Sequence, residues 1–163
     1  MRSRQAPSRL GPDGAERISA GAYGLLVAAS TLLGLGSSPT LTIIAVVVVT
    51  NLIYYATHVF AYTIGSTEGR IGWVDIQHHL YVSAPMFSAA FAPLAIVLIG
   101  LAFGADTRAA TLFGVIGATL LLSVEAVIGM RLRGIRGWPV LAVAAGTVVA
   151  ATVLILAKAL LLP

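Results

Sequence analysis

Four hydrogen-bonding side chains recur at helical spacing inside a long apolar stretch of this chain. Asn51, Tyr55, His58 and Tyr62 follow i, i+4, i+7 and i+11 spacing, so a helix places them on one face. In hydrocarbon, each unsatisfied polar group costs several kcal/mol. A membrane helix that gathers such groups on one stripe therefore turns them away from lipid. Such a stripe could line a cavity for a proton or a small cation.

A single carboxylate, Glu125, lies in a later apolar stretch. A lone carboxylate in hydrocarbon is costly, so it faces protein or water, pairs with another group, or is protonated. His58 and Glu125 each lie about 9–10 Å inside the same predicted membrane boundary, at roughly 1.5 Å per residue. His58 and Glu125 could therefore pair across neighbouring helices, or each could be buried without a partner; in either case the site could hold or pass a proton near neutral pH.

A second group of ligand-type side chains precedes the third apolar stretch. Asp75, His78 and His79 share a helix face at i, i+3 and i+4 spacing. Imidazole and carboxylate groups are ligands for Zn or Fe. Together with His58 and Glu125, they are the candidate ligands of a membrane-embedded metal-binding protein or enzyme. The chain has no His-Glu-x-x-His motif, the dense spacing typical of a helical metal site.

The same residues also have interpretations without chemistry. His58 could bridge to a carbonyl group of a neighbouring helix. Glu125 could extend toward Arg131 at the membrane boundary. Asn51 could hold two helices together, and the two consecutive histidines could be a solvated pair near the membrane surface. In that case the chain would be a structural or assembly subunit of a membrane complex.

The composition indicates that the chain lies in a membrane. Of its 163 residues, 58% are hydrophobic and only 10% are charged, against about 25% charged residues in a soluble domain. The net charge of +4 indicates membrane topology rather than nucleic-acid binding. The sequence contains no phosphate loop, dinucleotide fingerprint or nucleophile elbow, so an ordinary soluble enzyme is not indicated. The absence of cysteine excludes disulfides and thiolate chemistry.

The apolar blocks predict an all-α integral membrane protein with a bundle of about five transmembrane helices, at roughly 20 residues per span. Residues 1–16 are basic and contain Pro and Gly, so we predict a disordered cytoplasmic tail. Residues 17–163 are predicted to form one transmembrane helical domain. The expected spans are residues 18–35, 41–64, 80–103, 109–130 and 138–161.

Arginine and lysine positions predict the orientation. The N-terminal tail and residues 131–136 carry most of the basic residues, whereas Arg108 and Lys158 lie on the opposite side. We therefore expect the N-terminus inside and the C-terminus outside a bacterial cell membrane. Rows of small residues in several spans permit close helix packing and predict a homo-oligomer.

Two stretches carry a resemblance to known families. Residues 16–24 and 54–61 resemble the first two spans of small multi-pass membrane proteins of actinobacterial type. Arg17 and the Tyr55-x-x-His58 spacing are also similar to the bacterial relatives of the lysosomal potassium channel, whose first two spans carry an Arg and an aromatic-x-x-His motif. The Phe-Ser-Asp motif of that channel family is absent after Arg17, so the resemblance implies no pore residue here.

The leading hypothesis from the sequence is an oligomeric channel or transporter. It would move a proton or small cation along the polar stripe of the second span, with the buried Glu125 of the fourth span taking part. The metal-binding and the structural alternatives remain open.

Overall fold

The computed structural model describes residues 11–36, 38–66 and 72–161. Every regular element in these ranges is a helix and none is a strand, which confirms the predicted all-α class. The helices are α1 (Pro12–Leu35), α2 (Thr40–Ser66), α3 (Trp73–Ser88), α4 (Phe91–Ala102), α5 (Thr107–Leu132) and α6 (Trp138–Leu161).

Four helical stretches in the described ranges are long and apolar enough to cross a membrane: α1, α2, α3 together with α4, and α5. Helix α6 has 24 residues and supplies the fifth member of the predicted bundle. Large hydrophobic side chains such as Phe60 and Phe103 point outward and are exposed, as suits a surface in contact with lipid. The chain is therefore a multi-pass membrane protein.

Two helices begin earlier than the apolar pattern indicates. Helix α1 begins at Pro12, inside the segment predicted to be a disordered tail; residues 1–10 of that tail lie outside the described residues. Proline suits the first turn of a helix, and the carboxylate of Asp13 is favourable at the positive end of the helix dipole. Helix α3 begins at Trp73, and its start is stabilised because the Gly72 N–H donates to Asp75 Oδ2 at 3.0 Å.

The third span is broken rather than continuous. Helix α3 ends at Ser88 and α4 begins at Phe91, with a short turn between them. Pro93 has no N–H, so it cannot bond the carbonyl four residues earlier. The Ala90 N–H bonds the Phe87 carbonyl at 3.2 Å, which tightens the chain at this point. The third span therefore consists of two helices, α3 and α4, rather than one.

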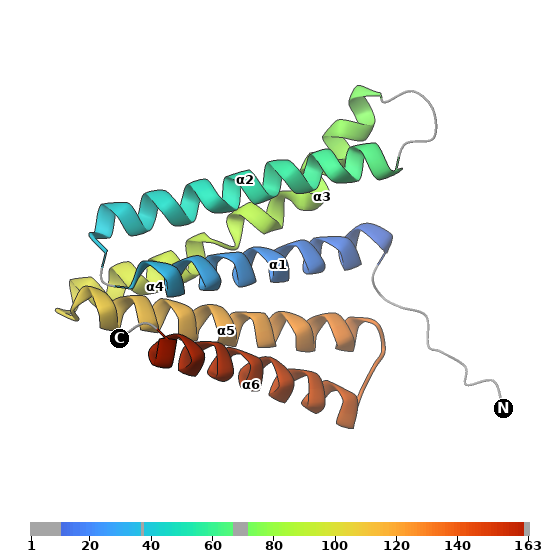
Figure 1. Ribbon diagram of the computed structural model, residues 1–163. Helices are drawn as coiled ribbons and strands as arrows, with labels where there is room; N and C mark the ends of the chain where they lie inside the picture. Colours follow the sequence, from blue (N-terminus) through green and yellow to red (C-terminus); the bar gives the residue numbers. More distant parts are fainter. Residues whose placement is uncertain (1–10, 37, 67–71, 162–163) are drawn as a thin grey trace.

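Helix α1 is at the centre of the bundle. It packs against α2 and α3 on one side and against α5 on the other, and α5 packs in turn against α4 and α6 (Figure 1). The close approach of α1 and α3 depends on Gly24, because a methyl group there would overlap the carbonyl group of Met86. The buried core includes Leu32, Ile43 and Val47.

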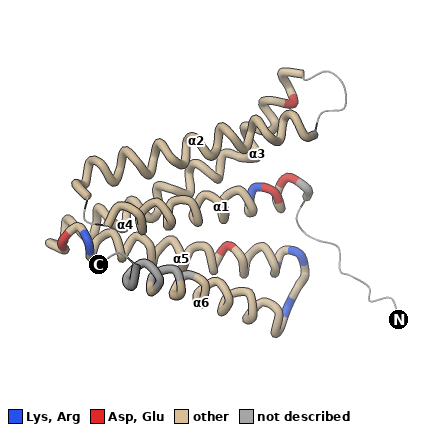
Figure 2. Tube along the Cα trace, viewed as in Figure 1, with Lys and Arg blue, Asp and Glu red and all other residues tan. Residues whose placement is uncertain are grey.

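Charged residues lie mostly at the ends of the helices. Figure 2 shows this distribution, with one acidic position inside α5. That position is Glu125, the carboxylate singled out by the sequence. The arrangement of α1 between two helical layers decides which polar residues can meet.

Candidate functional site: a polar seam between α2 and α3

The polar stripe of α2 lies along α3. Asn51 is completely buried. The Tyr55 hydroxyl donates to the Leu80 carbonyl oxygen at 3.1 Å. The Tyr62 ring packs edge-on against His79, with 4.8 Å between ring centroids. We use the name polar seam for Asn51, Tyr55, His58 and Tyr62 of α2 together with His79 of α3; among the α2 residues, Tyr55 and Tyr62 make the contacts with α3.

At one end of the bundle, the polar seam meets further titratable groups. Here α1 begins, α2 ends and α3 begins (Figure 1). All three histidines of the chain lie at this end, in or beside the seam. We call the group the end cluster; it consists of Asp13, Glu16, Arg17, His58, Tyr62, His78, His79 and Tyr81.

The side chains of the end cluster touch one another in a series. His78 Nε2 lies 3.8 Å from Asp13 Oδ1. The His78 and His79 rings are 5.7 Å apart, and the His58 and Tyr62 rings are 5.9 Å apart, between centroids. Since Tyr62 also contacts His79, these contacts connect a carboxylate of α1 to the imidazole of His58.

Arg17 and Glu16 tie α1 to this cluster from the other direction. Arg17 Nη1 donates to the Tyr81 carbonyl oxygen at 2.9 Å, and its Cζ lies 4.2 Å from the centroid of the Tyr81 ring. The second contact is a cation–π interaction. The Glu16 carboxylate faces the Tyr62 hydroxyl. The end cluster therefore holds three helices together as well as gathering titratable groups.

His58 opens onto the surface of the protein. Together with Ala61, Tyr62 and Gly65 it lines an open hollow of ≈ 420 Å³. These residues follow i, i+3, i+4 and i+7 spacing, so they belong to one face of α2. An imidazole in such a place can exchange protons with water at the membrane boundary.

Asn51 lies at the deep end of the polar seam. Its Nδ2 donates to the Val47 carbonyl oxygen of its own helix at 3.0 Å. Its Oδ1 is buried and has no hydrogen-bond partner among the described residues. Leaving a buried acceptor unpaired costs roughly 1–3 kcal/mol. Asn51 thus offers a hydrogen-bond acceptor about two helical turns beyond His58.

His58 and Glu125, which the sequence allowed to pair, form no hydrogen bond or ion pair with each other. Helix α1 lies between α2 and α5 and packs against both (Figure 1). Glu125 lies against Gly21 of α1, where a methyl group would be 2.9 Å from Glu125 Oε1. The two groups were placed at the same depth by counting residues, but depth does not determine which helices are neighbours.

The candidate metal ligands do not form one cluster. Glu125 lies at the α1–α5 interface, the carboxylate of Asp75 bonds the Gly72 N–H at the start of α3, and the histidines belong to the end cluster. Within the described ranges, no group of three or more His, Asp or Glu side chains is placed to hold a metal ion. The five candidate ligands therefore do not come together as one Zn or Fe site in the described part of the chain.

No family model, curated protein or solved structure matches this chain. Its function is therefore argued from its own residues.

Four members of the end cluster were missed by the sequence analysis: Asp13, Glu16, Arg17 and Tyr81. Asp13 and Glu16 belonged to the predicted tail, and Arg17 was noted only for a family resemblance. The spacing of Asp13, Glu16 and Arg17 is i, i+3 and i+4, which places these three on one face of α1. Pro12 followed by Asp13 is a helix-start signal that could have extended the first span to include them.

Proposed function

We propose that this protein is a small channel or transporter that moves protons or small cations along the polar seam, as a homo-oligomer in a bacterial cell membrane. The observation that supports this function best is the series of contacts in the end cluster, from Asp13 through His78, His79 and Tyr62 to His58. Imidazole rings, tyrosine hydroxyls and the carboxylates of α1 touch in series at one end of the bundle. The stripe of α2 continues from there to the buried Asn51.

The residue types suit proton transfer. Histidine gains and loses a proton near neutral pH, and tyrosine hydroxyls both donate and accept hydrogen bonds. Carboxylates at the mouth of a path raise the local concentration of cations. In this proposal Asp13 and Glu16 attract the cation, His58 and His79 exchange the proton, and Asn51 accepts a hydrogen bond at the deep end.

The polar seam covers only part of the membrane depth within one subunit. The hollow beside His58 is on a face of α2, so the rest of the path would lie between subunits. Chains this small have little interior for a complete aqueous path of their own.

Flux measured in proteoliposomes tests the function. Purified protein is reconstituted into vesicles with a pH gradient, and the internal pH is followed with a trapped dye. We expect His58→Ala and His79→Ala each to slow the flux about tenfold or more, which corresponds to about 1.4 kcal/mol in the barrier. Tyr54→Phe is the matched control, since Tyr54 is exposed and contacts Tyr23 rather than α3. Unchanged flux in both histidine variants would overturn the proposal.

A structural role is the second candidate, and the contact of Arg17 with Tyr81 favours it. If the end cluster only joins helices, its variants will lower the thermal stability or the oligomer yield, and wild-type vesicles will show no flux above that of empty vesicles. The same reconstitution therefore separates the two functions.

A further inference from the structure

Glu125 forms no ion pair or hydrogen bond with any of the described residues, and its Oε2 atom is buried. It belongs to the middle of the second half of α5 (Thr107–Leu132), away from the charged ends of the helices (Figure 2). An ionised carboxylate in hydrocarbon without a partner costs several kcal/mol.

Gly21 of α1 provides the space that the carboxyl group occupies. A methyl group at Gly21 would lie 2.9 Å from Oε1, 3.2 Å from Oε2 and 3.4 Å from Cδ of Glu125. The next turn is also close, because a methyl group at Gly129 would lie 3.3 Å from the Ile18 side chain. The carboxyl group therefore fits into a notch between α1 and α5, which we call the Glu125–Gly21 notch.

No cation in the described part of the chain faces this notch. Helix α5 packs against α1, α4 and α6; α4 has no titratable residue, and neither does α6 from Trp138 to Ala150. On α1 the nearest titratable side chains along the helix are Tyr23, whose ring packs against Tyr54 of α2, and Arg17, one turn away, whose guanidinium is engaged by Tyr81. On α5 itself, Arg131 and Arg133 lie beyond the next turn, at the end of the helix.

The surroundings also decide what the carboxyl group can bind. Hard metal cations take six or more oxygen ligands, and the Glu125–Gly21 notch offers the two oxygens of one carboxyl group. A proton needs only one of these oxygens.

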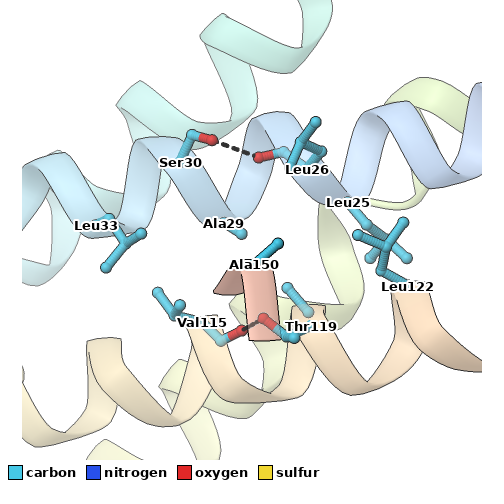
Figure 3. A pocket seen from close by; sticks show the side chains of 10 residues that line it. Leu25, Leu26, Ala29, Ser30, Leu33, Val115, Thr119, Leu122 and Ala150 are labelled. Atoms are coloured by element: carbon cyan, nitrogen blue, oxygen red, sulfur yellow. Dashed lines mark hydrogen bonds between the residues drawn. The ribbon is translucent and has the colours of Figure 1, made fainter. Parts of the chain in front are cut away.

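An apolar pocket begins one turn away, lined by α1, α5 and Ala150 of α6; Figure 3 shows Leu25 and Leu122 side by side at one end of it. Its hydroxyl groups bond their own helices, Ser30 to the Leu26 carbonyl at 2.8 Å and Thr119 to the Val115 carbonyl at 2.9 Å, so its walls are effectively apolar.

We infer that the Glu125–Gly21 notch is a proton-binding site, separate from the polar seam, whose carboxyl group is protonated at neutral pH and reached through lipid. This site is a candidate for modification by an apolar carbodiimide such as dicyclohexylcarbodiimide. The protonated carboxyl group adds across one C=N bond of the reagent. A carboxyl oxygen bonds to the central carbon, the proton moves to nitrogen, and an O-acylisourea forms without a leaving group or an oxidant.

Labelling followed by peptide mass spectrometry tests the inference. Membranes containing the full chain are treated with dicyclohexylcarbodiimide at about pH 7. We expect an adduct on Glu125 and none on Asp106, which is exposed at the start of α5 and accepts the Ala109 N–H at 2.9 Å. Absence of the Glu125 adduct, or an equal yield on Asp106, would overturn the inference.

Two alanine variants of α1 test the role of the notch. Gly21→Ala must displace the carboxyl group, so we expect the labelling rate of Glu125 to change by about threefold or more. Gly34→Ala is the matched control, because an added methyl group there meets nothing within 4 Å, and its rate should equal that of the wild type. An unchanged rate in Gly21→Ala would contradict the inference. If this variant fails to fold, Glu125→Asp, which withdraws the carboxyl group from Gly21, serves the same comparison.

The labelling test is independent of transport. Labelling without flux would remove only the proposed function, and flux without labelling would remove only this site.

Discussion

Gly24 in the middle of α1 gives the strongest prediction about packing. Replacing it with alanine adds a methyl group that would overlap the Met86 carbonyl oxygen and lie 2.8 Å from the carbonyl carbon and 2.9 Å from Cα. All three atoms belong to the backbone of α3, so no side-chain rotation can relieve the contact. Carbon atoms in contact prefer roughly 3.5–4.0 Å. Helices α1 and α3 must therefore separate.

The expected magnitude follows from two opposing terms. Overpacking of a buried position costs roughly 1–3 kcal/mol, and here the rigid partner places the cost at the upper end. Replacing glycine by alanine within a helix gains roughly 0.5–1 kcal/mol. The net destabilisation of Gly24→Ala is then about 2 kcal/mol. For a chain of this size that lowers the Tm by about 4–8 °C.

Thermal unfolding in a mild detergent measures this effect, with the helical circular-dichroism signal as the readout. Gly34→Ala on the same helix is the control, since nothing lies within 4 Å of the added methyl group. We expect its Tm to equal or slightly exceed that of the wild type. A Gly24→Ala protein as stable as Gly34→Ala would refute the close approach of α1 and α3.

Three further predictions concern polar groups. Arg17→Gln loses the hydrogen bond and the cation–π contact with Tyr81 and should lower the stability by about 1–2 kcal/mol in denaturant titration; an unaffected midpoint would mean that this contact is weak in solution. Asn51→Leu should leave the stability unchanged or raise it, because the Oδ1 atom has no partner to lose, while proton flux falls; flux at the wild-type level would remove Asn51 from the path. His58→Ala and Glu125→Gln should be additive in stability within about 0.5 kcal/mol, as expected of groups that do not touch; a larger coupling energy would restore the pairing that the fold argues against.

The helical class and the polar stripe could be predicted because they depend on local sequence. The length of each apolar block predicts a span, and the spacing of Asn51, Tyr55 and Tyr62 predicts a shared face. The identity of the neighbouring helix could not be predicted. Tyr55 and Tyr62 contact α3, the next helix along the chain, but nothing in their spacing distinguishes α3 from α5 as the partner.

The position of Glu125 shows the same limit more sharply. Counting residues predicts the depth of Glu125 in the membrane. The residues that contact Glu125 depend on the position of α1 between α2 and α5. Gly21 carried a usable signal, because a glycine in the middle of an apolar helix often marks a close approach of another helix. Asp13 and Glu16 were missed for a different reason: apolar length alone does not show that a polar helix start extends a span.

Water access to the polar seam is the central claim, and the chain is suited to a direct test because it contains no cysteine. Single cysteines are placed at His58 and Tyr62, in the polar seam, and at Ile53 and Phe60, whose side chains are 58% and 67% exposed on the outer surface of α2. Their reaction rates with a membrane-impermeant, charged thiol reagent are measured with the protein in lipid vesicles and the reagent on both sides. Since the reactive thiolate forms in water and not in hydrocarbon, the seam cysteines should react about tenfold or more faster than the other two. Equal rates, or faster reaction at Ile53 and Phe60, would contradict a water-accessible polar seam.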